Sequence, residues 1–416
     1  FSNKKEILLK VMLVFICVFV IIIIIIQILW NAKTSPKTEI YHSGESNIIK
    51  KIIDGCSIIH ESYVPIHIWG KSGHLQSIFF SAIGRFGKTP KYESHRYKLG
   101  GDDGSLVSYD LFTTKVHKNS VTIVVVPGIC NHSENKYIKV FAQHMNQHGY
   151  KVAVLNHTGA LKNVPLTRPR IFTYGYTDDL DLVVSDLIVK NPGEKLIGIG
   201  FSLGANVLMK YLGEKPERQL NFLFAASLCQ GYNLPECITV MSEWDNLRRL
   251  YYFGLTRNML KVISYHKDKF ESHSIKNNIP LDWKRISSAK ALHELDHHFT
   301  AKVYGDISDM AAFYRSNSSS TYMKNIFIPT LVLNAKDDPL IPESLFKYPR
   351  SLCDTNPNVV FVVTPYGGHL GFFEGGYIIP NRLSWLDRML LEFTNVALDV
   401  VIKNDVLEPK EVVFEC

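Results

Sequence analysis

Short runs of almost uninterrupted apolar residues alternate with helix-like stretches along most of the chain after residue 120. These runs occupy residues 121–126, 151–156, 195–200, 221–228, 330–335 and 358–363. Strands that are apolar on both faces are typical of a parallel sheet covered by helices on both sides. The alternation therefore predicts an α/β fold with a mostly parallel central sheet. Residues 96–112 add two strand-like runs around the turn GGDDG and predict an antiparallel hairpin.

The alternation stops between residues 233 and 325, where aromatic and charged residues are frequent. We expect a mostly helical insertion that lies as a cap over the carboxyl ends of the strands, where parallel sheets bind ligands. Residues 31–68 lack clear periodicity, and ordered structure is expected to begin near Trp69. The expected divisions are an N-terminal flank at 1–10, a transmembrane anchor at 11–30, a lead-in at 31–68, a first part of the core at 69–232, the cap at 233–325, a second part of the core at 326–403 and a C-terminal tail at 404–416.

Residues 11–30, VMLVFICVFVIIIIIIQILW, contain no charge and match the roughly 20 residues that a helix needs to cross a bilayer core. The run is longer than the apolar core of a cleaved signal peptide and ends in WNAK, so it predicts an uncleaved signal anchor and a single-pass membrane protein. Lysines are slightly more frequent before the span than after it, which favours a cytoplasmic N-terminus. Glycosylation sequons at Asn131, Asn156 and Asn317 matter only if the domain faces a lumen or the outside.

The composition excludes several classes of protein. A hydrophobic content of 46% argues against disorder. The formal charge of +7 is modest for 416 residues, and no basic block is interleaved with aromatic residues, so nucleic acid is not an expected partner. The seven cysteines are scattered without a CxxC pair, which suits neither a disulfide scaffold nor a structural zinc site.

The pentapeptide GFSLG at 200–204 joins a predicted strand to a predicted helix. A G-x-S-x-G string alone is weak evidence, but its position at a strand-to-helix turn is the setting that a nucleophilic serine requires. Such a tight turn leaves no room for side chains at Gly200 and Gly204, and it holds Ser202 in an exposed, strained conformation. The sequence therefore predicts Ser202 as a nucleophile.

A nucleophilic serine needs a base, and the base needs a carboxylate that orients it. In this architecture both follow the serine along the chain, with the carboxylate first. Asp337 and Asp338 follow one predicted strand and compete for the role of the acid; Asp338 is favoured because it lies one residue further beyond the strand end. His369 follows the last predicted strand after two glycines that permit an irregular backbone. We therefore expect a triad of Ser202, Asp338 and His369.

A tetrahedral oxyanion needs two hydrogen-bond donors near the serine. The first is expected to be the backbone N–H of Leu203, at the start of the helix. The second should come from the loop after the strand at 121–126, where either Gly128 or Ile129 is a candidate.

The string HELDH at 293–297 matches the zinc motif H-E-x-x-H and must be weighed against the serine. The longer zinc motif requires glycine and histidine where this chain has Thr300 and Val303. Leu292, Leu295 and Phe299 have helical spacing and predict a packing face instead. We therefore expect no metal and no cofactor.

Taken together, these strings resemble the abhydrolase-domain proteins of the α/β-hydrolase superfamily over most of the chain. The resemblance rests on WGKSGHLQS at 69–77, PGICNHSENKYI at 127–138, GFSLGANVLMKYLGE at 200–214, LNAKDDPLIPESL at 333–345 and GGHLGFFEG at 367–375. It implies Ser202 as nucleophile, Asp338 as acid and His369 as base, together with a single type II membrane anchor. It also implies an acylglycerol lipase activity and, by resemblance alone, a possible steroid ligand. The H-x-x-x-x-D acyltransferase string of some relatives is absent from the sequence.

The resulting hypothesis is a membrane-anchored serine hydrolase that cleaves lipid esters, monoacylglycerols above all, through an acyl-enzyme. Its expected partners are a lipid ester and the membrane. The alternative is a membrane receptor whose hydrolase fold binds a lipid or a steroid with little turnover.

Overall fold

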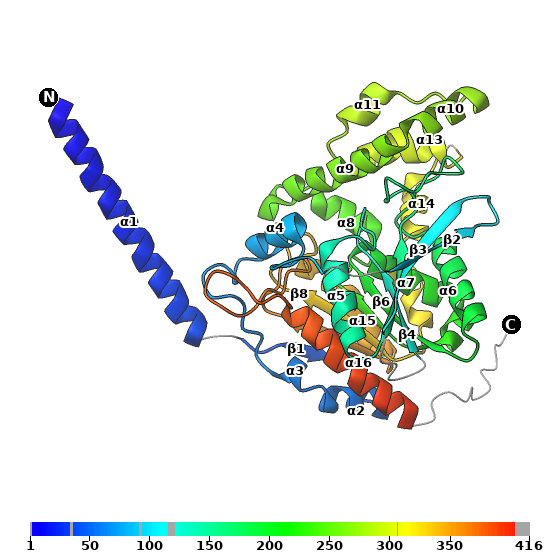
Figure 1. Cartoon of the computed structure of the whole chain (residues 1–416), viewed down its shortest axis with the longest axis horizontal. Helices are drawn as coiled ribbons and strands as arrows, with labels where there is room; N and C mark the ends of the chain where they lie inside the picture. The colour runs from blue at the N-terminus through cyan, green and yellow to red at the C-terminus, as the bar shows by residue number, and fades with distance from the viewer. Residues whose placement is uncertain (1, 34–35, 91–93, 115–120, 306, 404–416) are drawn as a thin grey trace.

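The computed structural model describes residues 2–33, 36–90, 94–114, 121–305 and 307–403. Within these residues a nine-stranded sheet has the order β1-β9-β8-β7-β6-β4-β5-β3-β2 (Figure 1). The strands are β1 (Glu39–Tyr41), β2 (His95–Gly100), β3 (Leu106–Phe112), β4 (Val121–Val126), β5 (Lys151–Asn156), β6 (Lys195–Phe201), β7 (Phe222–Leu228), β8 (Thr330–Ala335) and β9 (Val359–Thr364). Strands β4 to β9 are parallel, and β1, β2 and β3 are antiparallel to their neighbours. The predicted α/β class and the hairpin are confirmed.

Alternate residues of each central strand face two separate cores. In β4, Ile123 and Val125 belong to the core on one face of the sheet, and Val124 and Val126 belong to the core on the other. The first core is closed by α2 (Asn47–Gly55), α3 (Ser57–His60), α5 (Lys136–Gln147) and α16 (Trp385–Lys403). The second is closed by α6 (Asp178–Lys190), α7 (Leu203–Glu214) and α15 (Lys347–Thr355). The continuous apolar strands thus reflect burial on both faces.

Ordered structure begins well before Trp69, which corrects the expectation from the sequence. Strand β1 pairs with β9, and α2 buries Ile49, Ile52 and Ile53 in the core that α16 also closes. These isoleucines have the spacing of one helix face, and the Ser46 side chain caps the helix by accepting the Ile49 N–H. A three-residue strand and a nine-residue helix are too short for a clear periodic pattern, so the sequence alone does not distinguish this segment from a linker.

Helix α1 (Ser2–Lys33) projects from the body of the protein (Figure 1). In the described part of the chain, its segment Lys10–Gln27 is the one helical span long and apolar enough to cross a membrane, and none of it is buried. By length and composition this helix fits the predicted anchor and would equally fit a signal sequence. The type II topology stays a prediction.

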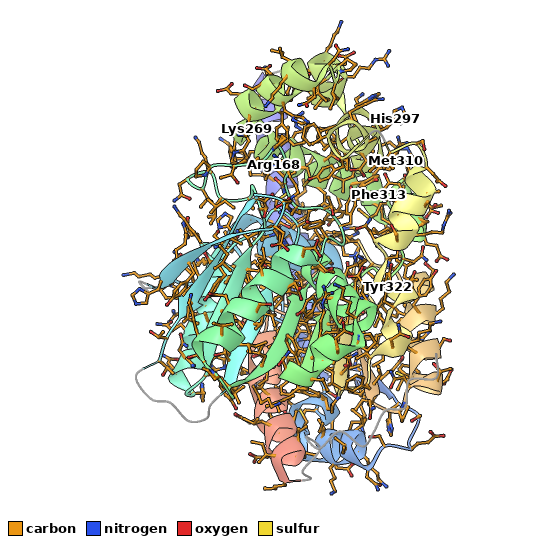
Figure 2. The ribbon with its side chains drawn as sticks, turned by 90° about the vertical axis from the view of Figure 1, so that its right-hand side faces the viewer. Arg168, Lys269, His297, Met310, Phe313 and Tyr322 are labelled. Atoms are coloured by element: carbon orange, nitrogen blue, oxygen red, sulfur yellow. The ribbon has the colours of Figure 1, made fainter. Side chains whose placement is uncertain are left out.

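The segment between β7 and β8 is mostly helical, as expected. Its helices are α8 (Leu234–Met241), α9 (Arg248–Tyr265), α10 (Lys267–Asn277), α11 (Trp283–Ser288), α12 (Leu292–Leu295), α13 (Ala301–Val303) and α14 (Met310–Ser316). All of these helices except α14 contribute to a third core, to which the loop after β5 adds Ile171 and Phe172. Figure 2 shows His297 and Met310 in this cap, above the sheet, and Tyr322 lower, beside the sheet. The domain divisions themselves stay predictions.

Short helical turns complete the described secondary structure. They are the 3-10 turns η1 (Pro216–Asn221), η2 (Asp245–Leu247), η4 (Ser319–Thr321), η5 (Met323–Asn325) and η6 (Glu343–Phe346), and the π-helical turn η3 (Asp296–Thr300). Helix α4 (Gly73–Ile83) precedes the hairpin and lies near the start of α9 (Figure 1).

Candidate active site

Ser202 lies in the turn between β6 and α7 with a backbone conformation of φ 54° and ψ −117°. A Cβ at Gly200 would lie 2.4 Å from Ala205 Cα, and one at Gly204 would lie 2.0 Å from the carbonyl oxygen of Val126. No real side chain tolerates either distance, so the strand and the helix approach this closely only because both positions are glycine. The turn thereby holds Ser202 in the strained conformation expected of a nucleophile at a strand end.

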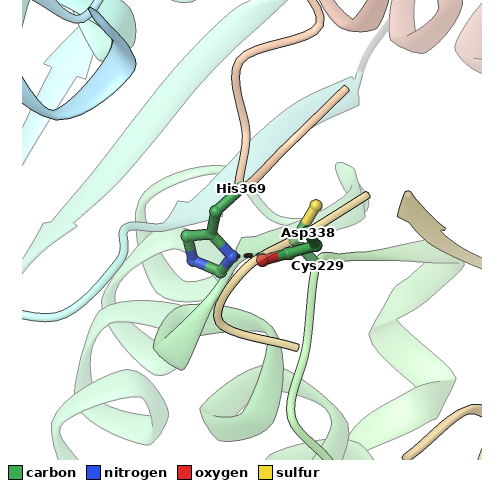
Figure 3. Close-up of side chains that lie close together, drawn as sticks. All are labelled: Cys229, Asp338 and His369. Carbon is green, nitrogen blue, oxygen red and sulfur yellow. Dashed lines mark hydrogen bonds and ion pairs between the residues drawn. The ribbon is translucent and has the colours of Figure 1, made fainter. Parts of the chain in front are cut away.

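A chain of hydrogen bonds runs from Ser202 to His369 and on to Asp338. Ser202 Oγ lies 2.8 Å from His369 Nε2, and His369 Nδ1 lies 2.8 Å from Asp338 Oδ2 (Figure 3 shows the second contact). His369 is 9% exposed and Asp338 is 1% exposed. Both distances are within the range for proton transfer between a nucleophile, a base and its orienting acid. The structure brings the three residues together, and their catalytic roles stay a prediction.

The loop after β8 directs its two neighbouring aspartates to different partners. Asp338 Oδ1 accepts two hydrogen bonds from backbone N–H groups of the same loop, which leaves Oδ2 for His369. Asp337 Oδ1 instead accepts the N–H of Gly368 at 2.8 Å, and its Oδ2 has no hydrogen-bond partner among the described residues. Burial raises the pKa of Asp337 to about 7. The geometry thus favours Asp338 over Asp337 as the partner of the histidine.

The loop that carries His369 is held against the first two turns of α4. The His369 N–H donates to Ser77 Oγ at 2.8 Å. Gly368 has a φ of 54°, and a Cβ there would lie 2.5 Å from the carbonyl oxygen of Gly73. Only glycine fits this close approach of two backbones. The sequence gives no sign of this role for Ser77, although the string WGKSGHLQS contains it.

The two candidate positions for the second oxyanion donor differ in the structure. The Gly128 N–H donates to the hydroxyl of Tyr137 at 3.3 Å, so this group is already engaged. Ile129 lines the same pocket as Ser202 and Leu203. Ile129 is therefore the better candidate of the two, with the Leu203 N–H at the start of α7 as the other donor.

A pocket of about 120 Å³ opens beside Ser202, between the sheet edge and the cap. Helix α9 contributes Tyr252 and Leu255 to its wall, and α8 contributes Ile238 and Met241. The lining is largely apolar, with the serine and the histidine at one side. Such a pocket suits an apolar ligand of small to moderate size with one polar reacting group.

Cys229 adjoins the acid and base, and its Sγ lies with Asp338 and His369 in a group whose ligand atoms are within 4.8 Å of one another (Figure 3). In the described residues this is the one group of three such side chains with metal-ligand spacing. A cysteine binds a metal as the thiolate. Burial, aided by the charge of Asp338, raises the pKa of Cys229 well above its usual value, which favours the neutral thiol. The group therefore fits an acid–base pair with a neutral thiol packed beside it better than a metal site.

The HELDH string occupies the cap. Leu295 and Phe299 are buried in the cap core, as the predicted packing face requires. The Nδ1 of His293 lies 3.2 Å from the hydroxyl of Tyr252, whereas His297 is exposed (Figure 2). No metal-spaced group of the described residues includes either histidine.

The chain belongs to the alpha/beta hydrolase family, because the family model described as alpha/beta hydrolase fold matches residues 121–376. Within this class it is similar to monoacylglycerol lipase ABHD2 of Danio rerio, with 40% identity over 349 residues that cover 83% of this chain and 82% of the relative. The human protein of that name is 37% identical over 357 residues, 84% of each chain. Abhydrolase domain-containing protein 2 of Drosophila melanogaster is 38% identical over 339 residues, 80% of this chain and 84% of the relative. The resemblance inferred from the sequence is confirmed.

Proposed function

We propose that the protein is a membrane-anchored serine hydrolase that cleaves lipid esters through an acyl-enzyme. The observation that carries this proposal is the continuous hydrogen-bond chain from Asp338 through His369 to Ser202, which ends at the wall of an apolar pocket. An activated hydroxyl at the side of such a pocket suits an ester that has an apolar acyl chain and a small polar reacting centre.

The proposed reaction has two halves. Ser202 Oγ attacks the ester carbonyl while its proton passes to His369 Nε2, and Asp338 holds the ring and stabilises the imidazolium. The N–H groups of Leu203 and Ile129 donate to the oxyanion. The imidazolium then protonates the leaving alcohol, and water, deprotonated by the same histidine, attacks the acyl-enzyme. The second half releases the carboxylic acid and restores the serine hydroxyl.

We infer that the substrate is an acylglycerol, and most simply a monoacylglycerol. Two relatives named monoacylglycerol lipase support this inference, and so does the apolar helix α1, which would keep the pocket near a bilayer. The steroid ligand that the resemblance implies stays a prediction, as does the use of the three glycosylation sequons.

A fluorophosphonate probe and a panel of lipid esters test the proposal, because only an activated serine reacts with the probe. The intact protein should be labelled and should hydrolyse monoacylglycerol. Ser202→Ala should lose labelling and about 10⁴-fold or more of the rate. Ser272→Ala, which removes an exposed hydroxyl on α10, is the matched control and should behave as the wild type. Wild-type activity in Ser202→Ala would end the proposal, and binding of lipid without labelling would favour a receptor.

A further inference from the structure

Large apolar side chains are exposed on three segments that are distant in the sequence. Helix α4 exposes one face at Leu75 and Ile78, three residues apart, and Ile83 follows at its end. The second segment exposes Trp244 and Leu247 just before α9 and Leu250 and Phe253 within it, and the third exposes Tyr377, Ile378 and Ile379 in the loop after β9. We call these ten residues the docking surface. Apolar residues exposed together in this way mark an interaction site.

Side-chain contacts join the three segments into one surface. His74 of α4 binds the hydroxyl of Tyr251 and the side chain of Asn246 at 2.8 and 2.7 Å. Trp69 packs on Phe79 of α4 with ring centroids 4.6 Å apart, and its Nε1 donates to the carbonyl oxygen of Ile378 at 2.9 Å. The α9 segment and the loop therefore flank α4.

The same side of the molecule carries the end of α1. The ammonium group of Lys71, two residues after Trp69, lies 5.8 Å from the ring centre of Trp30. Five residues, 34–38, separate α1 from β1. An extended chain of this length spans only about 20 Å. A bilayer crossed by α1 would therefore lie close to the hydrolase domain, whatever path these five residues take. Figure 1 shows α4 and the end of α1 on the same side.

Helix α9 lies between this surface and the pocket. Tyr252 and Leu255 line the pocket beside Ser202, whereas Leu250 and Phe253 are exposed on the outside. The guanidinium carbon of Arg249 lies 4.8 Å from the ring centre of Trp244. This pairing of a charged group with an aromatic ring suits the boundary between lipid tails and headgroups.

We propose that the docking surface sits in the interfacial layer of the same bilayer that α1 spans, so that a lipid leaves the membrane and enters the pocket alongside α9. The occupant is a lipid bilayer rather than a second copy of the chain, because the surface is continuous with the membrane-spanning candidate through Lys71 and Trp30. The lipid route rests on the proposed function, whereas the docking of the surface does not.

The depth of single positions in the membrane tests the docking. A fluorescent amino acid replaces Ile378, Leu250 or, as a matched control, Ile275 in the full chain, which is reconstituted in phosphatidylcholine vesicles that contain doxyl-labelled lipid. Ile275 is 83% exposed against 63% for Ile378, and it lies on α10, beyond the far end of α9, whose 18 residues span roughly 27 Å. Lipid quenching at 378 and 250 should exceed that at 275 by at least twofold.

Equal, weak quenching at all three positions would overturn the proposal. Protection of position 378 from both doxyl lipid and aqueous iodide would overturn it too, and would assign the surface to a second copy.

Kinetics test the lipid route. The double variant Ile378→Asp/Ile379→Asp should lose about tenfold in apparent affinity for monoacylglycerol embedded in vesicles, while kcat on a soluble short-chain ester is unchanged; Ile275→Asp should match the wild type on both substrates. Equal losses on both substrates would overturn the route. A wild-type protein without esterase activity would refute the proposed function, and the quenching result would still decide the docking.

Discussion

Asp338 at the sheet edge and Asp296 in the cap are both buried carboxylates near the same pocket, but their partners differ. Asp338 faces the ring of the candidate base. Asp296 accepts hydrogen bonds from the hydroxyls of Tyr174, Thr300 and Tyr314 at 2.6, 2.7 and 2.9 Å, and these residues come from three segments of the chain. Burial alone therefore does not identify a chemical role. The partner of Asp338 can exchange protons, whereas the partners of Asp296 join the cap to the loop after β5.

The largest expected effect is a loss of kcat that distinguishes Asp338 from Asp337. Asp338→Asn should lower kcat by about 10⁴-fold on a soluble ester, because an amide no longer holds the histidine in the required tautomer. Asp337→Asn, the matched control, should retain most of the activity, since its carboxyl accepts from backbone N–H groups of the site loop and does not contact the histidine ring. Steady-state kinetics of both variants measure the difference, and equal losses would contradict the assignment of the acid.

Alanine substitutions at two glycines test whether the core is packed more tightly than the cap. Gly204→Ala places a methyl group 2.0 Å from a carbonyl oxygen and should destabilise the protein by about 3 kcal/mol or more. At Gly254, within α9, an added methyl group would meet no atom within 4 Å, so Gly254→Ala should stabilise the helix by about 0.5–1 kcal/mol. Denaturation midpoints in detergent measure both changes; a tolerated alanine at 204 would show that the turn is looser than these distances indicate.

Removal of the cap carboxylate should affect stability more than chemistry. Asp296→Ala leaves three buried hydroxyls without their acceptor and should cost about 2–4 kcal/mol. Turnover of a soluble short-chain ester at a temperature where the variant is folded should be unchanged, because the hydrogen-bond chain to Ser202 is intact. Asp296→Asn keeps an acceptor and is the conservative control. A loss of kcat in both variants would assign Asp296 to the reaction.

The smallest expected effect is a dependence of stability on pH. Burial raises the pKa of Asp296 to about 6 and that of Asp337 to about 7, from an ordinary value of 3.8. The folded state therefore holds these protons more tightly than the unfolded state. The stability they provide is complete below about pH 4 and is lost as the pH rises through about 6 and 7.

Melting temperatures between pH 4.5 and 8 measure this dependence. Relative to the wild type, Asp296→Asn and Asp337→Asn should lose less stability as the pH rises, because an amide does not titrate. Parallel curves for the three proteins would contradict the shifted pKa values.

Much of the fold was predictable because its strands are buried on both faces. Such strands appear as unbroken apolar runs, and their carboxyl ends meet at one edge, so the positions of Ser202, His369 and a neighbouring pair of aspartates followed from the order of the strands. The choice between Asp337 and Asp338 was not fixed in this way. It depends on the direction in which a loop turns each carboxylate, and here backbone N–H groups of the loop set that direction.

The parts that were missed depend on contacts between distant segments. Strand β1 is defined by its partner β9 rather than by its own three residues. The role of Ser77 appears only when α4 meets the histidine loop, 292 residues further along the chain. The Tyr137 hydroxyl, which engages the Gly128 N–H, is likewise invisible before α5 packs beside the turn.

The short connection between α1 and β1 determines which substrate concentration would control the rate of an enzyme anchored by α1. An enzyme held within about 20 Å of a bilayer meets its lipid by lateral diffusion in two dimensions. Its velocity then follows the mole fraction of substrate in the surface rather than the bulk molarity, so dilution with inert amphiphile slows turnover at constant total substrate. Under the proposed anchoring by α1, the composition of the surrounding lipid would thereby control the rate of the enzyme.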